Sequence, residues 1–456
     1  MKNFIKLLTF ATLMTIVVSC RKKEVLDVDF NKYNLDFPEG NSDLDKWLNT
    51  SFLDPYNMRV IYKFNRYYYG DPSADITPPK AENVQPMMQI VSDGYLIPYK
   101  KVAGLNFVQK TNPKEWVLYG SNKYQTDGSA IAGTASGGTR ITLYGLNYYS
   151  AAPSFATSRL YVIHHEFTHI LNQTVAIPID FEAISGGSYK QPWTATSAAT
   201  AKENGFLGSY ASGSPTEDYA ETTATLLVSG QSYYDNYANT ANATAKSRLK
   251  LKESNVVNYF NTAFGINFRQ LQREVQNYIK NTLKDPAVSF GYWLNRNLYK
   301  TMSINLENDV TYSQYGISDP FKTAYLSAKT NVGNIYSNAS KLTMTSLKLT
   351  FTSATAMTLT VNFSQGTTNY VAVYNYTMAI SDATGATKFT LVTTPAYTGN
   401  ALLLQSAMQP IFTYLDTNNF TADWLPAGYV AGPYSNFGGF YVTGSPTNYF
   451  YGALTQ

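Results

Sequence analysis

The clearest hydrophobic pattern in the chain is helical and covers about residues 158–172. Apolar residues recur there at helical spacing, which predicts an amphipathic helix; they are Leu160, Ile163, Phe167 and Ile170. A second helix should begin at Ser214-Pro215, because Ser is a favourable N-cap and Pro suits the first helical position. Residues 139–149 predict a strand, whereas the Gly- and Ser-rich residues 130–138 before them predict a loop.

Beyond about residue 300 the pattern changes to alternating polar and apolar positions. Runs of this kind are separated by turn residues and predict antiparallel β-structure; they cover residues 343–352, 356–363, 370–381 and 388–394. Residues 231–298 look mainly helical instead. We therefore expect an α+β protein with a helix-rich domain at 43–300, followed by a mainly antiparallel β domain at 301–456 whose role the sequence does not name.

The N-terminal residues predict a targeting signal rather than part of the folded domain. Lys2 and Lys6 precede an apolar run of a dozen residues, which is too short to span a bilayer and suits a secretory signal peptide at 1–19. Cys20 follows where cleavage would occur, and the residues before it resemble a bacterial lipobox. We expect Cys20 to carry a lipid anchor and residues 20–42 to form a tether; the alternative is a buried free thiol.

Composition narrows the function classes. The chain has 456 residues, with 35 Lys plus Arg and 31 Asp plus Glu, so its formal charge is 35 − 31 = +4. This small excess, without a Lys/Arg run, argues against a nucleic-acid partner. A single Cys excludes an internal disulfide. All 3 His lie between residues 164 and 169, which points to one site.

The histidines form an H-E-x-x-H motif on the first predicted helix: His165-Glu166-Phe167-Thr168-His169. Four residues turn a helix by about 400°, so His165 and His169 lie about 40° apart on one face and can bind one Zn²⁺. Glu166 lies about 100° further round, where it can take a proton from a water. His164 points away and is expected to be only a neighbour. The alternative is three histidines that bind no metal.

A zinc site with two histidines needs another protein ligand, and no further His exists. The candidates are therefore carboxylates: Asp180, Glu182, Glu203, Glu217, Asp218 and Glu221. Glu217 and Glu221 share a face of the second predicted helix, so one can bind zinc while the other orients a ligand imidazole. Asp218 points elsewhere and suits the helix dipole. Ser214-x-x-Glu217 is also a capping box, which leaves a structural reading of Glu217 open.

The HHEFTH run, followed by residues 205–221, resembles the substrate-import-associated zinc metallohydrolases. These are gluzincin-type lipoproteins that accompany TonB-dependent import systems of the outer membrane. The E-x-x-A-E block ending at Glu221 is also similar to the E-F-F-A-E block of lethal-factor-like gluzincins, with Asp218-Tyr219 in place of two Phe. The resemblance implies a zincin-like domain at 43–300, Glu217 as third ligand, and Tyr210 as oxyanion donor.

The expected function is thus a gluzincin-type zinc metallopeptidase that acts on a peptide or protein. Glu166 would be its base, and residues 139–149 its edge strand for substrate. We expect an outer-membrane-anchored lipoprotein of the cell envelope, with a TonB-dependent import complex as partner. The alternative is a non-catalytic lipoprotein that captures glycan or peptide through stacking on its many Tyr and Trp. Structural zinc sites usually have four protein ligands, so three favour the hydrolase.

Overall fold

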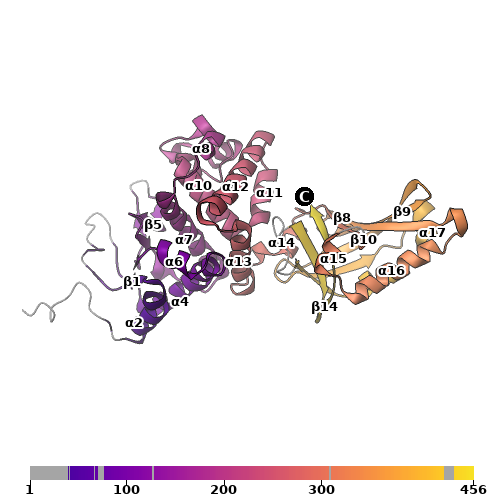
Figure 1. Cartoon of the computed structure of the whole chain (residues 1–456), viewed down its shortest axis with the longest axis horizontal. Helices are drawn as coiled ribbons and strands as arrows, with labels where there is room; N and C mark the ends of the chain where they lie inside the picture. Colours follow the sequence, from indigo (N-terminus) through magenta and orange to yellow (C-terminus); the bar gives the residue numbers. More distant parts are fainter. Residues whose placement is uncertain are drawn as a thin grey trace, which may run out of the picture.

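The computed structural model describes residue 40 and residues 42–65, 67–69, 76–125, 128–307, 310–425 and 436–456. The predicted signal peptide (1–19), Cys20 and nearly all of the predicted tether (20–42) lie outside these ranges. Within them, no helix has both the length and the apolar character to cross a membrane. Figure 1 shows a helix-rich part followed along the long axis by a β-barrel.

The helix-rich part contains a small sheet and many helices. The helices are α2 (Asp43–Leu48), α3 (Asp54–Tyr56), α4 (Ala81–Val91), α5 (Ile97–Ala103), α6 (Leu105–Thr111), α7 (Pro153–Thr174), α8 (Ile179–Ser185), α9 (Ala198–Glu203), α10 (Pro215–Ala224), α11 (Gln231–Asn239), α12 (Ala243–Phe264) and α13 (Phe268–Asn281). The next helix, α14 (Phe290–Asn295), contributes buried residues to the core of the C-terminal part. Both helices predicted from the sequence are present: α7 extends beyond residues 158–172 at each end, and α10 begins at Pro215 behind the N-cap Ser214.

The sheet of this part has the order β1-β2-β6-β5. Its strands are β1 (Arg59–Ile61), β2 (Glu115–Leu118), β6 (Arg140–Leu143) and β5 (Gly133–Ser136). The first three are parallel, and β5 runs antiparallel to β6 at one edge. A separate hairpin pairs β3 (Lys123–Tyr124) with β4 (Ala130–Ile131).

The edge strand is not the one that the sequence suggested. Of residues 139–149, only β6 is a strand, and it lies inside the sheet between β2 and β5. A 3-10 turn follows at Leu146–Tyr148. The edge strand beside β6 is β5, which comes from the predicted loop 130–138. Its small residues carry no hydrophobic alternation, and pairing with β6 makes it a strand.

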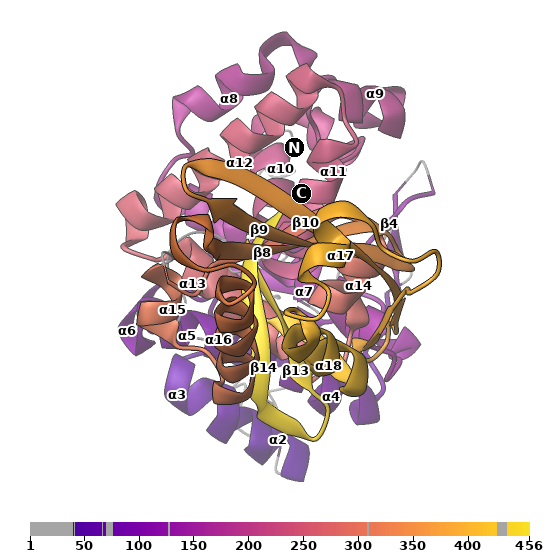
Figure 2. The ribbon, with the colours of Figure 1, turned by 90° about the vertical axis from the view of Figure 1, so that its right-hand side faces the viewer.

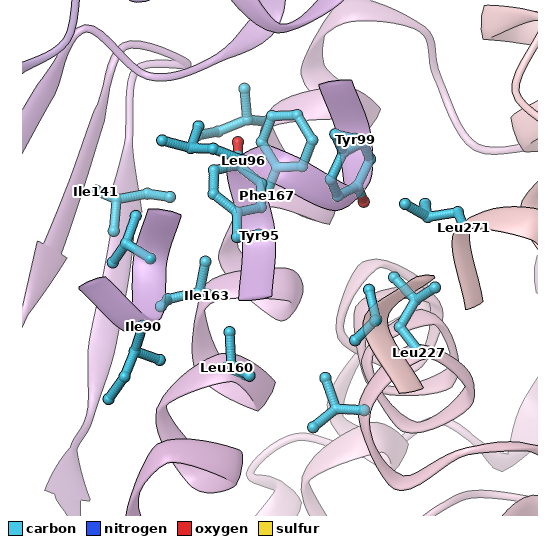
Figure 3. Close-up of a cluster of buried hydrophobic side chains, with 14 of the residues drawn as sticks. Ile90, Tyr95, Leu96, Tyr99, Ile141, Leu160, Ile163, Phe167, Leu227 and Leu271 are labelled. Carbon is cyan, nitrogen blue, oxygen red and sulfur yellow. The ribbon is translucent and has the colours of Figure 1, made fainter. Parts of the chain in front are cut away.

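Helix α7 crosses the centre of this part and is held by its apolar face. Leu160, Ile163 and Phe167 are buried, and they pack in one cluster with Tyr95 and Tyr99. Figure 3 shows these side chains converging between α7 and the neighbouring elements. Each fully buried side chain of this size stabilises the fold by about 1.5–3 kcal/mol. The helix that carries the histidines is therefore rigidly supported.

The C-terminal part is a closed antiparallel barrel with the strand order β10-β11-β12-β13-β14-β7-β8-β9. Its strands are β7 (Thr301–Ile304), β8 (Leu342–Ser353), β9 (Ala356–Gln365), β10 (Thr368–Ile380), β11 (Ala386–Leu391), β12 (Phe420–Trp424), β13 (Phe437–Val442) and β14 (Ser445–Thr455). The helices are α15 (Val310–Tyr315), α16 (Asp319–Gly333), α17 (Gly399–Leu404) and α18 (Gln409–Thr417). Figure 2 looks at this part, with α16 and α18 beside the strands.

The predicted α+β class with a C-terminal antiparallel β domain is confirmed. Among the described residues there are two large hydrophobic cores: one draws on residues from Leu48 to Val288, and the other on residues from Phe290 to Tyr451. Along the chain, the buried residues pass from the first core to the second between Val288 and Phe290. Polar contacts join the parts, among them the hydroxyls of Ser232 and Tyr299 at 2.8 Å.

Candidate metal centre

Two helices that are distant in sequence bring the candidate ligands together. α7 supplies His165 and His169, and α10, which packs against it, supplies Glu217. Ala220 and Ala224 of α10 are fully buried, and small residues allow two helices to approach closely. Local structure explains the helix start, because the Glu217 N–H donates to Ser214 Oγ over 3.2 Å. The Glu217 carboxylate takes no part in this hydrogen bond and faces the two histidines.

The three ligand atoms form a small triangle. His165 Nε2 and His169 Nε2 are 3.0 Å apart, and Glu217 Oε2 lies 3.1 Å from the first and 3.2 Å from the second. Ligands at zinc bond lengths of about 2.0–2.2 Å with tetrahedral angles lie about 3.3–3.5 Å apart. The triangle is within a few tenths of an ångström of that spacing, so these residues fit a zinc ion.

The charges of the cluster also suit a cation. Burial opposes ionisation of Glu217, but its hydrogen bonds with His165 and His169 outweigh burial and hold its pKa well below the usual range. Burial would lower the His165 pKa, yet its contacts with Glu217 and Glu221 raise the pKa to about 10. Carboxylates thus lie close to the imidazoles. A divalent cation bound among these groups would stabilise their negative charge.

Behind the triangle, Glu221 and Tyr161 support His165. Glu221 Oε1 lies 2.9 Å from His165 Nδ1, on the side of the ring opposite Nε2. Its other oxygen accepts a hydrogen bond of 2.8 Å from the Tyr161 hydroxyl. A proton on Nδ1, facing Glu221, leaves the Nε2 lone pair free for a metal. The expectation that one Glu binds and the next orients an imidazole fits this arrangement.

Glu166 sits between α7 and the edge of the sheet. The carboxylate hydrogen-bonds the backbone of Ala135 in β5, and burial raises its pKa despite the nearby histidines. Gly133 of β5 lies so close that a Cβ there would be 3.5 Å from Glu166 Cγ. A carboxylate with a raised pKa beside histidines that fit a metal is suited to accept and return a proton.

Tyr210 lies over the cluster from the segment that precedes α10. Its ring centroid is 6.0 Å from that of His165, and the side chain is 40% exposed. Burial and the Glu217 carboxylate raise its pKa, so the phenol keeps its proton and remains a donor. Trp193, a residue that the sequence did not single out, packs edge-on against Tyr210 with a centroid separation of 5.5 Å.

The other sequence candidates lie outside the triangle. The metal-compatible group found among the described residues consists of His165, His169 and Glu217, without Asp180, Glu182 or Glu203. His164 is fully buried, and its Nε2 lies 3.2 Å from the Gly94 carbonyl oxygen. Burial lowers its pKa to about 4.

Asp218 lies in the first turn of α10, as expected, but it is buried and pairs with Lys252. The sequence does not single out Lys252, Tyr161 or Trp193, because none of them belongs to a local sequence motif. A search for charged or aromatic residues in otherwise apolar helix faces could have marked Lys252 on α12.

Comparison with known proteins shows the family of the chain. Residues 38–269 match the model of a family described as "Putative zinc-binding metallo-peptidase". The match covers half of the chain, and the protein belongs to this family of zinc metallopeptidases. The predicted membership in a zinc metallopeptidase family is thereby confirmed.

Among solved structures, the chain is similar to a putative zinc-binding metallo-peptidase from Bacteroides caccae. The identity is 26%, the alignment covers 52% of this chain and 93% of that one, and the TM-score is 0.45. A comparison with curated proteins gives no match.

Proposed function

We propose that this zinc metallopeptidase is of gluzincin type, with His165, His169 and Glu217 as the zinc ligands, Glu166 as the base and Tyr210 as the oxyanion donor. One observation carries the proposal: two imidazole nitrogens and one carboxylate oxygen from two helices converge within 3.2 Å. A site built from three protein ligands leaves a position for water or substrate, as catalytic zinc sites do.

Zinc bound there would supply Lewis acidity, which polarises a carbonyl and makes water acidic. Glu166 takes a proton from the attacking water and passes it to the amine that leaves. Its raised pKa helps it hold that proton between the two steps. The Tyr210 phenol donates a hydrogen bond to the carbonyl oxygen as negative charge develops, a contact that is typically worth 10²–10³ in rate.

The substrate backbone would pair with β5, the strand at the edge of the sheet. This strand pairs with β6 on one side, and Glu166 contacts it through Ala135. An extended peptide added to such an edge is held by main-chain hydrogen bonds. Its scissile bond then lies beside the base, and Glu221 with Tyr161 keeps His165 in the orientation that the metal requires.

The proposed setting is the outer membrane, with a lipid on Cys20 as the anchor and a TonB-dependent import complex as the partner. The support is the signal-peptide pattern at 1–19 and the lipobox-like residues before Cys20. Replacing Cys20 with Ala in the full chain should abolish labelling by a radioactive fatty acid and release the protein from membranes. Unchanged membrane association of that variant would refute the anchor.

The experiment that tests the activity is Glu166→Gln in the mature protein. The variant should bind one zinc, like the wild type, and lose cleavage of a mixed peptide library, because the amide cannot accept the proton. The matched control is Glu182→Gln, which changes an exposed residue of α8. This variant should cleave the library like the wild type. Full activity of Glu166→Gln would refute the mechanism, and zinc binding without any cleavage by the wild type would favour the capture lipoprotein.

A further inference from the structure

A fully buried ion pair lies behind the candidate metal centre. Lys252 of α12 and Asp218 of α10 approach within 2.7 Å, Nζ to Oδ2, and neither side chain is exposed. Asp218 follows the candidate ligand Glu217 directly. Burial raises the pKa of Asp218 to about 6 and lowers that of Lys252, so the site disfavours both charges. Because a buried ion pair is weak support for stability in itself, we consider what else its two side chains contact.

The Lys252 ammonium reaches beyond Asp218. It donates to the Gly205 carbonyl oxygen over 2.7 Å, and it lies 4.2 Å from the centroid of the Phe206 ring. Gly205 and Phe206 begin residues 205–213, the segment that carries Tyr210. One end of the Tyr210 segment is therefore fixed to α12 by a charged hydrogen bond, which is about twice as strong as a neutral one.

Asp218 holds a second segment. The Tyr189 hydroxyl donates to Asp218 Oδ2 over 2.8 Å, and Tyr189 begins residues 189–196, which carry Trp193. We call residues 189–196 and 205–213 the roof segments, because Trp193 and Tyr210 lie on them. The other carboxylate oxygen of Asp218 has no hydrogen-bond partner among the described residues.

The roof segments are also joined to each other. The Lys190 N–H donates to the Ser212 carbonyl oxygen, and Gln191 Nε2 donates to the Gly213 carbonyl oxygen, each over 2.8 Å. Trp193 packs against Tyr210, and a Cβ on Gly213 would lie 3.3 Å from Trp193 Cβ. Residues 205–213 lead directly into Ser214, the N-cap of α10. A shift of either segment would therefore move Tyr210.

We propose that Lys252 and Asp218 are positioning residues of the peptidase site. Their buried pair ties both roof segments to α10 and so sets the place of Tyr210 relative to the two histidines. This inference rests on the proposed function for the role of Tyr210. An apolar residue could fill the space of the Lys252 chain, but it could not bind the Gly205 carbonyl and the Asp218 carboxylate together.

The first test is a kinetic cycle with Lys252→Met, Tyr210→Phe and the double variant, each loaded with zinc. The substrate is one fluorogenic peptide selected from cleavage of the mixed library. Tyr210→Phe should lower kcat about 10²-fold or more. Lys252→Met should lower kcat by up to about 10²-fold, as expected for a misplaced catalytic group, with little change of KM. The double variant should be no more than about threefold worse than Tyr210→Phe.

A second arm separates position from stability. Lys252→Met alone leaves a buried carboxylate without its cation, so Asp218→Asn/Lys252→Met removes that charge as well. This neutral pair should regain thermal stability without regaining kcat. Lys280→Met is the control: Lys280 forms a partly exposed ion pair with Asp423 of β12 at 2.5 Å, and the loss of this pair should leave kcat unchanged.

A third arm needs no turnover. Hydrogen–deuterium exchange of the neutral pair should rise in residues 189–213 and stay at wild-type rates in α13 and the barrel. Unchanged exchange in residues 189–213 would overturn the proposal. So would multiplicative losses of kcat in the double variant, or full kcat in the neutral pair. A wild type that binds zinc and cleaves nothing would refute the proposed function instead, and the exchange arm would then decide whether the pair positions the roof segments.

Discussion

The support of His165 by Glu221 allows a prediction of zinc affinity. Glu221 Oε1 lies 2.9 Å from His165 Nδ1, and the Glu221 side chain is only 15% exposed. Glu221→Gln removes the carboxylate that fixes the ring and its tautomer. Loss of such a partner typically costs 10–100-fold in metal affinity, or about 1.4–2.7 kcal/mol. Tyr161→Phe should cost less, because Tyr161 contacts Glu221 rather than the imidazole.

The assay is competition for zinc with a fluorescent chelator at pH 7.5. Glu182→Gln on α8 removes one carboxylate outside the cluster and controls for the change of net charge. It should bind zinc like the wild type. Wild-type affinity in Glu221→Gln would refute the view that Glu221 orients a zinc ligand. A loss in Tyr161→Phe as large as in Glu221→Gln would show that the hydroxyl acts on the metal site by another route.

Two further predictions concern residues beside the site. The buried His164 has a pKa near 4, against 6.5 as a free side chain, so the unfolded chain binds more protons between these values. Stability should therefore fall as pH drops from about 6.5 to about 4, by up to about 3 kcal/mol, and His164→Gln should reduce this loss in urea unfolding; an identical pH profile would contradict it. Gly133→Ala would place a Cβ 2.5 Å from Val162 Cγ1 and 3.5 Å from Glu166 Cγ. The kcat of Gly133→Ala should fall about tenfold while zinc binding is retained. Gly187→Ala is the control, because its Cβ meets nothing within 4 Å, and it should keep the wild-type kcat. A wild-type kcat in Gly133→Ala would refute the prediction.

Features that depend on local chemistry were predictable from the sequence. The apolar spacing of Leu160, Ile163 and Phe167 indicated α7, and Ser214-Pro215 indicated the start of α10. Of the capping box predicted at Ser214-x-x-Glu217, one half is present: the Glu217 N–H donates to Ser214 Oγ, whereas the Glu217 carboxylate faces the histidines.

Features that depend on distant partners were not predictable. β5 is a strand because it pairs with β6, and its small residues show no period-2 pattern. Tyr161 meets Glu221 across 60 positions, and Lys252 meets Asp218 from another helix. The barrel closes through pairing of β7 with β14, whose residues are far apart in the sequence. A single sequence indicates which elements form, but not which of them become neighbours.

The most direct test of the account is the zinc content of a soluble form of the protein (residues 21–456) beside Glu217→Ala, with cleavage of a mixed peptide library measured in the same samples. The account predicts one zinc per chain and cleavage in the wild type, and the loss of both in the variant. A wild type that binds no zinc, or a Glu217→Ala variant that keeps both zinc and cleavage, would contradict it.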